Sequence, residues 1–91
     1  MMKKFIIERE IPGAGKMTAE ELQAISKTSN SVIAVLGKPY KWVESYVTKD
    51  KIYCIHEAES EDVIREHSSC AGFPANVVEE VKEVISPATA R

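Results

Sequence analysis

The sequence predicts an α+β fold in which a four-stranded antiparallel sheet carries two helices on one face. Three observations lead to this prediction. An alternating apolar segment opens the chain, two segments with helical apolar spacing each begin at a capping residue and end at a glycine, and a long hairpin pattern lies between them. The resulting order, strand–helix–strand–strand–helix–strand, is the split β-α-β (βαββαβ) arrangement of ferredoxin-like domains, for which we expect the strand order 4-1-3-2.

Each strand is expected from its alternation. The first covers residues 2–11, where Phe5 and Ile7 share one face and Glu8 and Glu10 share the other. The hairpin covers residues 40–47 and 52–58, with polar turn residues between them. The last strand covers residues 77–85, and its charged outward positions suit an edge of the sheet.

Both helices carry start and stop signals. Thr18 and Glu21 form the pattern of a capping box, and Gly37 ends the first helix. Ser60 is the expected cap of the second helix, which Gly72 ends. The apolar stripe of the first helix is expected to face the core.

The two faces of the hairpin differ in character. With residues 49 and 50 as the loop, one face pairs Tyr46 with Tyr53, Glu44 with Ile55, and Trp42 with Glu57. This face is large, aromatic and acidic, so Trp42, Glu44, Tyr46 and Tyr53 are expected to form a ligand pocket or an interface. The opposite face is compact and is expected to lie under the helices: Val43, Ser45, Val47, Ile52, Cys54 and His56.

Length, charge and cysteine content limit the number of domains, the partners and the compartment that we expect for this chain. The 91 residues predict one domain over residues 1–85, followed by a frayed tail at 86–91. The net charge of −2 and the scattered lysines indicate neither nucleic acid nor an anionic membrane as a partner. No signal peptide is evident, and Cys54 and Cys70 are expected to stay reduced, so we expect a cytoplasmic protein.

Two groups of side chains suit metal ions. Glu8 and Glu57 are expected on the same sheet face, with His67 reaching them from the sheet edge or from a partner chain. Such a carboxylate-rich site suits Mn²⁺, Mg²⁺ or Zn²⁺ better than it suits nickel. The second group is Cys54, His56, His67 and Cys70, whose spacing is not that of a zinc finger. For both groups the structural alternative, rim charges in the first and core side chains in the second, remains open.

Three segments together resemble a small domain-of-unknown-function family of ferredoxin-like proteins that includes an actinobacterial nickel-binding protein. These are residues 52–60 (IYCIHEAES), 64–67 (IREH) and 71–81 (AGFPANVVEEV). The resemblance implies a dimer of the α+β-barrel type, joined through open sheet faces. It also implies histidine ligands at the end of the first strand and in the Ala-Gly-x-Pro step, where this chain has Glu8, Arg9 and Phe73. His67, Cys54 and Glu57 match the family pattern.

The expected function is that of a small bacterial binding protein, a homodimer that holds a divalent metal ion or another small ligand. Two alternatives stay open. One is a small dimeric enzyme, such as a cofactor-free oxygenase or an isomerase, which rests on fold analogy. The other is a plain interaction subunit.

Overall fold

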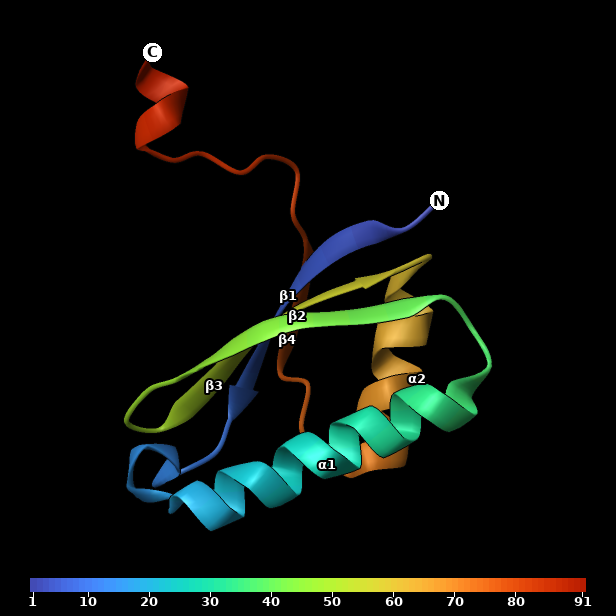
Figure 1. Cartoon of the computed structure of the whole chain (residues 1–91), viewed down its shortest axis with the longest axis vertical. Coiled ribbons are helices and arrows are strands. Elements are labelled where there is room, and N and C mark those ends of the chain that lie inside the picture. Colours follow the sequence, from blue (N-terminus) through green and yellow to red (C-terminus); the bar gives the residue numbers. More distant parts are fainter.

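Four strands and two helices follow one another in the predicted order in this computed structural model, which describes residues 1–91. The strands are β1 (Lys3–Glu10), β2 (Tyr40–Val47), β3 (Lys51–Ala58) and β4 (Val77–Glu80), and the helices are α1 (Ala19–Leu36) and α2 (Glu61–Ala71). The sheet is antiparallel with the order β2-β3-β1-β4, and both helices lie on one face of it (Figure 1). The ferredoxin-like fold and the strand order are therefore confirmed.

The ends of the helices follow the sequence signals with one exception. Thr18 Oγ1 accepts the N–H of Glu21, and the Glu21 carboxylate accepts the N–H of Thr18 in return, so the capping box is complete. Gly37 and Gly72 end their helices with φ values of 68° and 75°, a conformation that favours glycine. Ser60 occupies the cap position of α2, but its hydroxyl accepts no backbone N–H, so the predicted side-chain cap is wrong.

The core lies between the sheet and the helices. We call the covered side of the sheet the helix-side face and the other side the open face. Along β3 the buried and half-buried residues alternate strictly, as expected for a strand with one covered face. The helix-side face packs against Val63 and Ile64 of α2. By contrast, only Ser29 and Val32 of α1 are buried, because a cavity separates part of this helix from the sheet.

A β-bulge in β2 changes the predicted faces of the hairpin. Tyr46 lies opposite Tyr53 as predicted, but the register shifts between Trp42 and Glu44, and Trp42 lies opposite His56. The prediction that Trp42 faces Glu57 on the open face is therefore wrong. Because the bulge inserts one extra residue, Trp42 moves to the helix-side face and Val43 moves to the open face.

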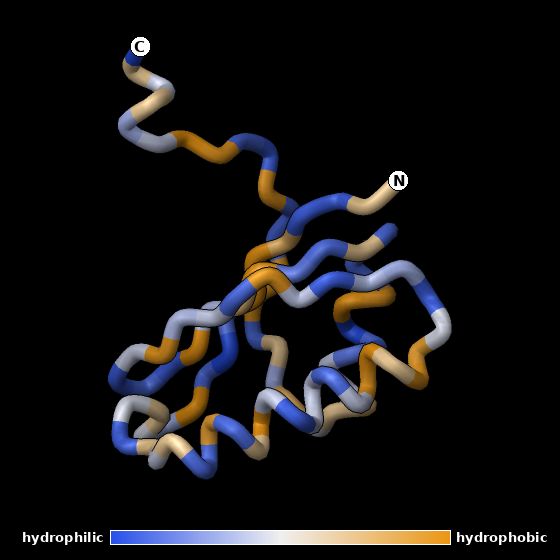
Figure 2. The backbone as a smooth tube through the Cα atoms, viewed as in Figure 1, coloured by the Kyte–Doolittle hydropathy of each residue, from blue (hydrophilic) through white to orange (hydrophobic).

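The last strand is shorter than predicted. β4 ends at Glu80, and only one further ladder bond follows, from the N–H of Val81 to the carbonyl of Lys4 at 2.8 Å. Since β1 begins at Lys3, the chain beyond Val81 has no partner strand and leaves the sheet. The resulting tail extends away from the helices (Figure 1), contains a short 3₁₀ helix at Pro87–Ala90, and carries an exposed apolar stretch (Figure 2).

Candidate functional site

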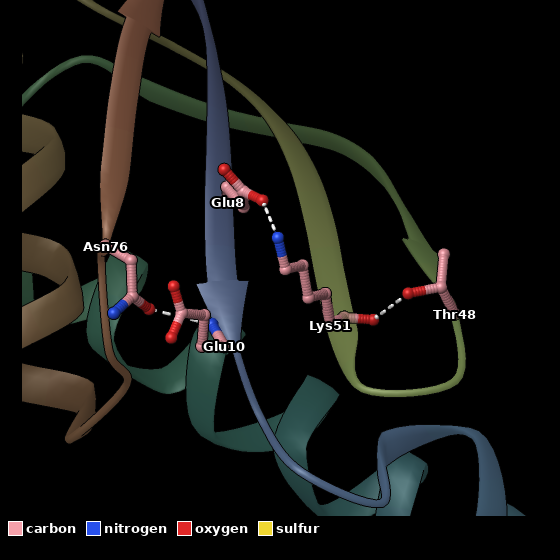
Figure 3. A network of polar contacts seen from close by, with 5 residues as sticks. All are labelled: Glu8, Glu10, Thr48, Lys51 and Asn76. Atoms are coloured by element: carbon pink, nitrogen blue, oxygen red, sulfur yellow. Dashed lines mark hydrogen bonds and ion pairs between the residues drawn. The ribbon is translucent and has the colours of Figure 1, made fainter.

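The three residues predicted as metal ligands do not converge within one chain. Glu8 lies on the open face of β1 and forms an ion pair with Lys51 of β3 (Figure 3). Glu57 lies on the same face, but the β1 residue opposite it is four positions from Glu8, which is about 13 Å along the strand. His67 belongs to α2 and is fully buried on the helix side of the sheet.

Polar contacts also occupy the end of β1 near Glu8. The N–H of Glu10 donates to Oδ1 of Asn76 at 2.7 Å, and the hydroxyl of Thr48 donates to the carbonyl of Lys51 at 2.9 Å (Figure 3). These contacts fasten β1 to the segment before β4 and close the hairpin turn. Together with the Lys51–Glu8 ion pair, they are structural contacts between neighbouring segments of the sheet.

Of the second predicted group, three side chains lie inside the fold. Cys54, His56 and His67 are buried, whereas Cys70 is exposed. The ring centroids of the two histidines are 5.2 Å apart. No three His, Cys, Asp or Glu side chains are positioned to hold a metal ion together. The group is therefore a pair of imidazoles and a thiol between the helices and the sheet.

A cavity of about 180 Å³ lies beside these side chains, between α1 and the sheet. We call it the helix-side cavity. Leu22 and Ile25 of α1 line one side of it, and Trp42 and Ile52 of the sheet line the other. Its polar side chains include Arg9, Ser45 and His56, each from a different strand of the sheet. Most of the lining is apolar, which is typical of pockets that bind small organic molecules.

Arg9 is buried in this region, although arginine side chains in proteins are mostly exposed to solvent. It is only 3% exposed, because position 9 continues the buried alternation of Phe5 and Ile7 along β1. A buried arginine is normally paired with a carboxylate, since an isolated charge is costly to remove from water. Arg9 forms no ion pair with any Asp or Glu side chain.

Neutral groups hold the guanidinium instead. Nε donates to the sulfur of Cys54 at 3.3 Å, and Nη1 donates to Ser68 Oγ at 2.9 Å and to the Pro74 carbonyl at 2.8 Å. The guanidinium carbon lies 5.4 Å from the centre of the Phe73 ring, a cation–π contact. Nη2 has no acceptor within the chain, so two of the five N–H groups of Arg9 are unused.

His56 is bonded to Tyr40 at the edge of the same cavity. The Tyr40 hydroxyl lies 2.6 Å from Nδ1 of His56, which is 1% exposed. Burial, the neighbouring His67 and the charge of Arg9 lower the pKa of His56 to about 3. Burial also raises the pKa of Tyr40 well above its usual value. At neutral pH the imidazole is therefore neutral and the phenol keeps its proton.

His67 connects the two helices. Its Nε2 lies 3.2 Å from Ser29 Oγ and 3.4 Å from the Ser29 carbonyl of α1, and its ring stacks on Tyr40 with centroids 4.9 Å apart. Burial lowers the pKa of His67; the bond to the Ser29 backbone opposes this shift, and the charge of Arg9 adds to it. Nδ1 of His67 is buried without a hydrogen-bond partner. His67 thus helps to hold the two helices together, which is a structural role.

The open face carries the other predicted pocket or interface residues. Glu44 accepts a hydrogen bond from Tyr46, which is 52% exposed and lies opposite Tyr53. A shallow groove on this face is lined by Ile6, Val43 and residues of the chain beyond β4. The open face therefore has a mainly apolar groove that is uncovered in one chain, with charged side chains such as Glu8 and Glu57 on the same face. Trp42 belongs to the cavity on the other side.

Comparisons with known proteins identify the family to which this chain belongs. A family model described as "Nickel responsive protein SCO4226-like" matches residues 5–81. The chain belongs to this SCO4226-like family. Its fold is similar to the crystal structure of SCO4226 from Streptomyces coelicolor A3(2), with a TM-score of 0.75 and 19% sequence identity over 90% of this chain and 99% of that chain. Among curated proteins no sequence matches. Neither helix has the length and apolar composition of a membrane span.

The family description concerns nickel, but the residues around Arg9 do not suit a divalent cation. At the two places where the resemblance implies histidine ligands, this chain has Arg9, next to Glu8, and Phe73, and these two side chains contact each other. The guanidinium is permanently positive, and no carboxylate neutralises it. A second positive charge in this interior would be repelled, so the helix-side cavity does not fit a metal ion.

Three residues of the cavity region were missed from the sequence: Arg9, Tyr40 and Phe73. A signal existed for Arg9, because strict alternation in β1 places it on the face of Phe5 and Ile7. No such signal existed for Tyr40, whose contact with His56 depends on the bulge register of the hairpin. Phe73 reaches Arg9 only through the turn after α2.

Proposed function

We propose that this protein is a non-enzymatic binding protein that takes a small organic molecule into the helix-side cavity. The observation that carries the proposal is the cavity itself. It is lined mainly by apolar side chains, and polar groups from three strands converge on it. An apolar cavity of about 150 Å³ is enough to hold benzene, so this cavity of about 180 Å³ suits a molecule built on one ring.

Trp42 supplies a direct test, because it lines the cavity and is the only tryptophan of the chain. The full chain is titrated with four single-ring probes: benzene, benzamide, benzoate and benzylamine. At least one probe should change the Trp42 fluorescence with saturation. If none does, the proposal is wrong.

A pair of serine variants locates the binding. Ser26 of α1 lines the cavity, whereas Ser31 of the same helix is exposed. Ser26→Phe should fill the cavity and abolish the saturable signal. Ser31→Phe, the matched control, should keep it. Equal binding to both variants would place the probe elsewhere and contradict the proposal.

Divalent-metal binding is a second candidate function, and the family description favours it. Its proposed ligands are Glu8 and Glu57 on the open face, and residues of a partner chain would have to complete the site, because His67 is fully buried on the helix side of the sheet. Calorimetric titration of wild type, Glu8→Ala and Glu57→Ala with Ni²⁺, Zn²⁺ and Mn²⁺ tests this. Binding that both variants weaken would support the candidate; equal binding by all three proteins would move the site elsewhere.

The proposal includes a homodimer in a reducing cytoplasm. Two observations support these additions. The groove on the open face leaves Ile6, Val43 and Tyr46 exposed in one chain, and monomers seldom expose large apolar patches. Both cysteines are free thiols.

A further inference from the structure

We propose that the ligand of the helix-side cavity is a small carboxylate, with one negative group received by Arg9 and an apolar body about the size of one ring. This inference rests on the proposed function and gives the chemical class of the ligand. It depends on the hydrogen-bonding character of the cavity, which offers donors and lacks a negative charge.

The first donor is Arg9. Its Nε and Nη1 groups are fully used by Cys54, Ser68 and Pro74, while Nη2 has no partner. His67 Nδ1 is the one fully buried side-chain polar atom without a partner, so Nη2 keeps some accessible surface. Since Arg9 lines the cavity, these two N–H groups and an unneutralised positive charge are available to a ligand there.

The second donor is His56. The Tyr40 hydroxyl has no acceptor other than Nδ1 of His56, so the phenol donates and Nδ1 accepts. In a neutral imidazole the proton then resides on Nε2. Nε2 has no partner within the chain and is not fully buried, and His56 lines the cavity. Tyr40 therefore positions an N–H donor of His56 for a ligand.

The third donor is Ser45. Nε1 of Trp42 donates to Ser45 Oγ at 2.9 Å, which occupies an acceptor position of the hydroxyl and leaves its proton free. Arg9, His56 and Ser45 lie on adjacent strands of one face. A ligand group facing these three donors must accept hydrogen bonds, and a carboxylate accepts without donating.

Charge decides between a carboxylate and a neutral acceptor. Arg9 is buried with no counter-charge, and a bound anion would supply it. Hydrogen bonds between charged groups are about twice as strong as neutral ones. The remaining lining, from Leu22 and Ile25 to Ile52, contacts only an apolar body.

The test compares three probes of nearly equal shape: benzoate, benzamide and benzylamine, which are negative, neutral and positive at neutral pH. The full chain is titrated with each, and the dissociation constant is read from Trp42 fluorescence. Benzoate should bind about tenfold or more tightly than benzamide, as a charge-assisted contact requires, and benzylamine should bind weakest.

The outcomes separate this inference from the proposed function. Similar affinities for all three probes would leave cavity binding intact and overturn the carboxylate preference. No binding of any probe would overturn both. Because this comparison uses wild-type protein, it tests the carboxylate preference even if variants of Arg9 do not fold.

Variants then test whether Arg9 causes the preference for benzoate over benzamide. Arg9→Met should remove the advantage of benzoate over benzamide. Arg65→Met is the matched control, because Arg65 is exposed and paired with Glu61, and it should keep the advantage. An unchanged preference in Arg9→Met would overturn the role given to Arg9.

Discussion

Acidification from about pH 7.5 to about pH 5 should destabilise the fold through its buried histidines. His56 is 1% exposed, and its pKa in the folded protein is lowered to about 3. In the unfolded chain a histidine titrates near pH 6.5. As the pH falls below 6.5, this histidine binds a proton in the unfolded chain, whereas in the folded protein His56 binds one only near pH 3. The stabilisation is therefore complete above pH 6.5 and is lost progressively between pH 6.5 and about pH 3.

The size of the effect follows from the same values. A pH of about 5 lies about 1.5 units below the pKa of a histidine in the unfolded chain. Protonation of this histidine then stabilises the unfolded state by about 2 kcal/mol, whereas folded His56 stays neutral. The pKa of His67 is lowered as well, so His67 acts in the same direction. For a domain whose total stability is about 5–15 kcal/mol, this is a large fraction.

Urea unfolding followed by Trp42 fluorescence measures this loss at the two pH values. With a slope of about 1–2 kcal/mol per molar urea, the midpoint should fall by about 1–2 M at the lower pH. His56→Gln is the control, because Gln keeps an acceptor for the Tyr40 hydroxyl but does not titrate. Its stability should depend on pH less steeply, by about 2 kcal/mol over this interval. A wild-type loss below about 0.5 kcal/mol, or equal pH dependence in both proteins, would refute the reasoning.

Three further predictions concern the interface and the thiols. Sedimentation at micromolar protein should give a dimer; a species of about 10 kDa alone would contradict this. Tyr46→Glu, on the open face, should weaken the dimer, whereas Ser31→Glu, at an exposed position of α1, should not. Equal dimerisation of the two variants would mean that the open face is not the interface. Cys54→Ala should cost about 1–2 kcal/mol in chemical unfolding, because it removes a small core side chain and an acceptor of Arg9; complete loss of folding would show a larger role.

The bulge in β2 shows where reading the hairpin from sequence fails. The pairing of Tyr46 with Tyr53 follows from the turn, because register near a short loop is set by the loop. Beyond Glu44 the strand gains a residue, although neither glycine nor proline is present there to indicate it. Trp42 gains a place opposite His56 and a bond to Ser45 on the helix-side face. These are tertiary contacts that alternation within one strand cannot reveal.

Arg9 shows the opposite failure, in which the pattern was correct but the residue type was misleading. Its phase in β1 matches Phe5 and Ile7, yet arginine is seldom fully buried. Only the folded chain brings the acceptors from Cys54, Ser68 and Pro74 together around it.

The sequence by itself determined the order of elements and the helix limits at Thr18, Gly37 and Gly72, because period and capping are local properties of the chain. The strand order could then be expected from the βαββαβ arrangement that this order of elements matches. The tertiary structure alone decided which polar side chains meet. It separated Glu8 from Glu57 and joined Arg9 to the helix-side cavity, because such meetings depend on register, a bulge and packing between segments far apart in the chain.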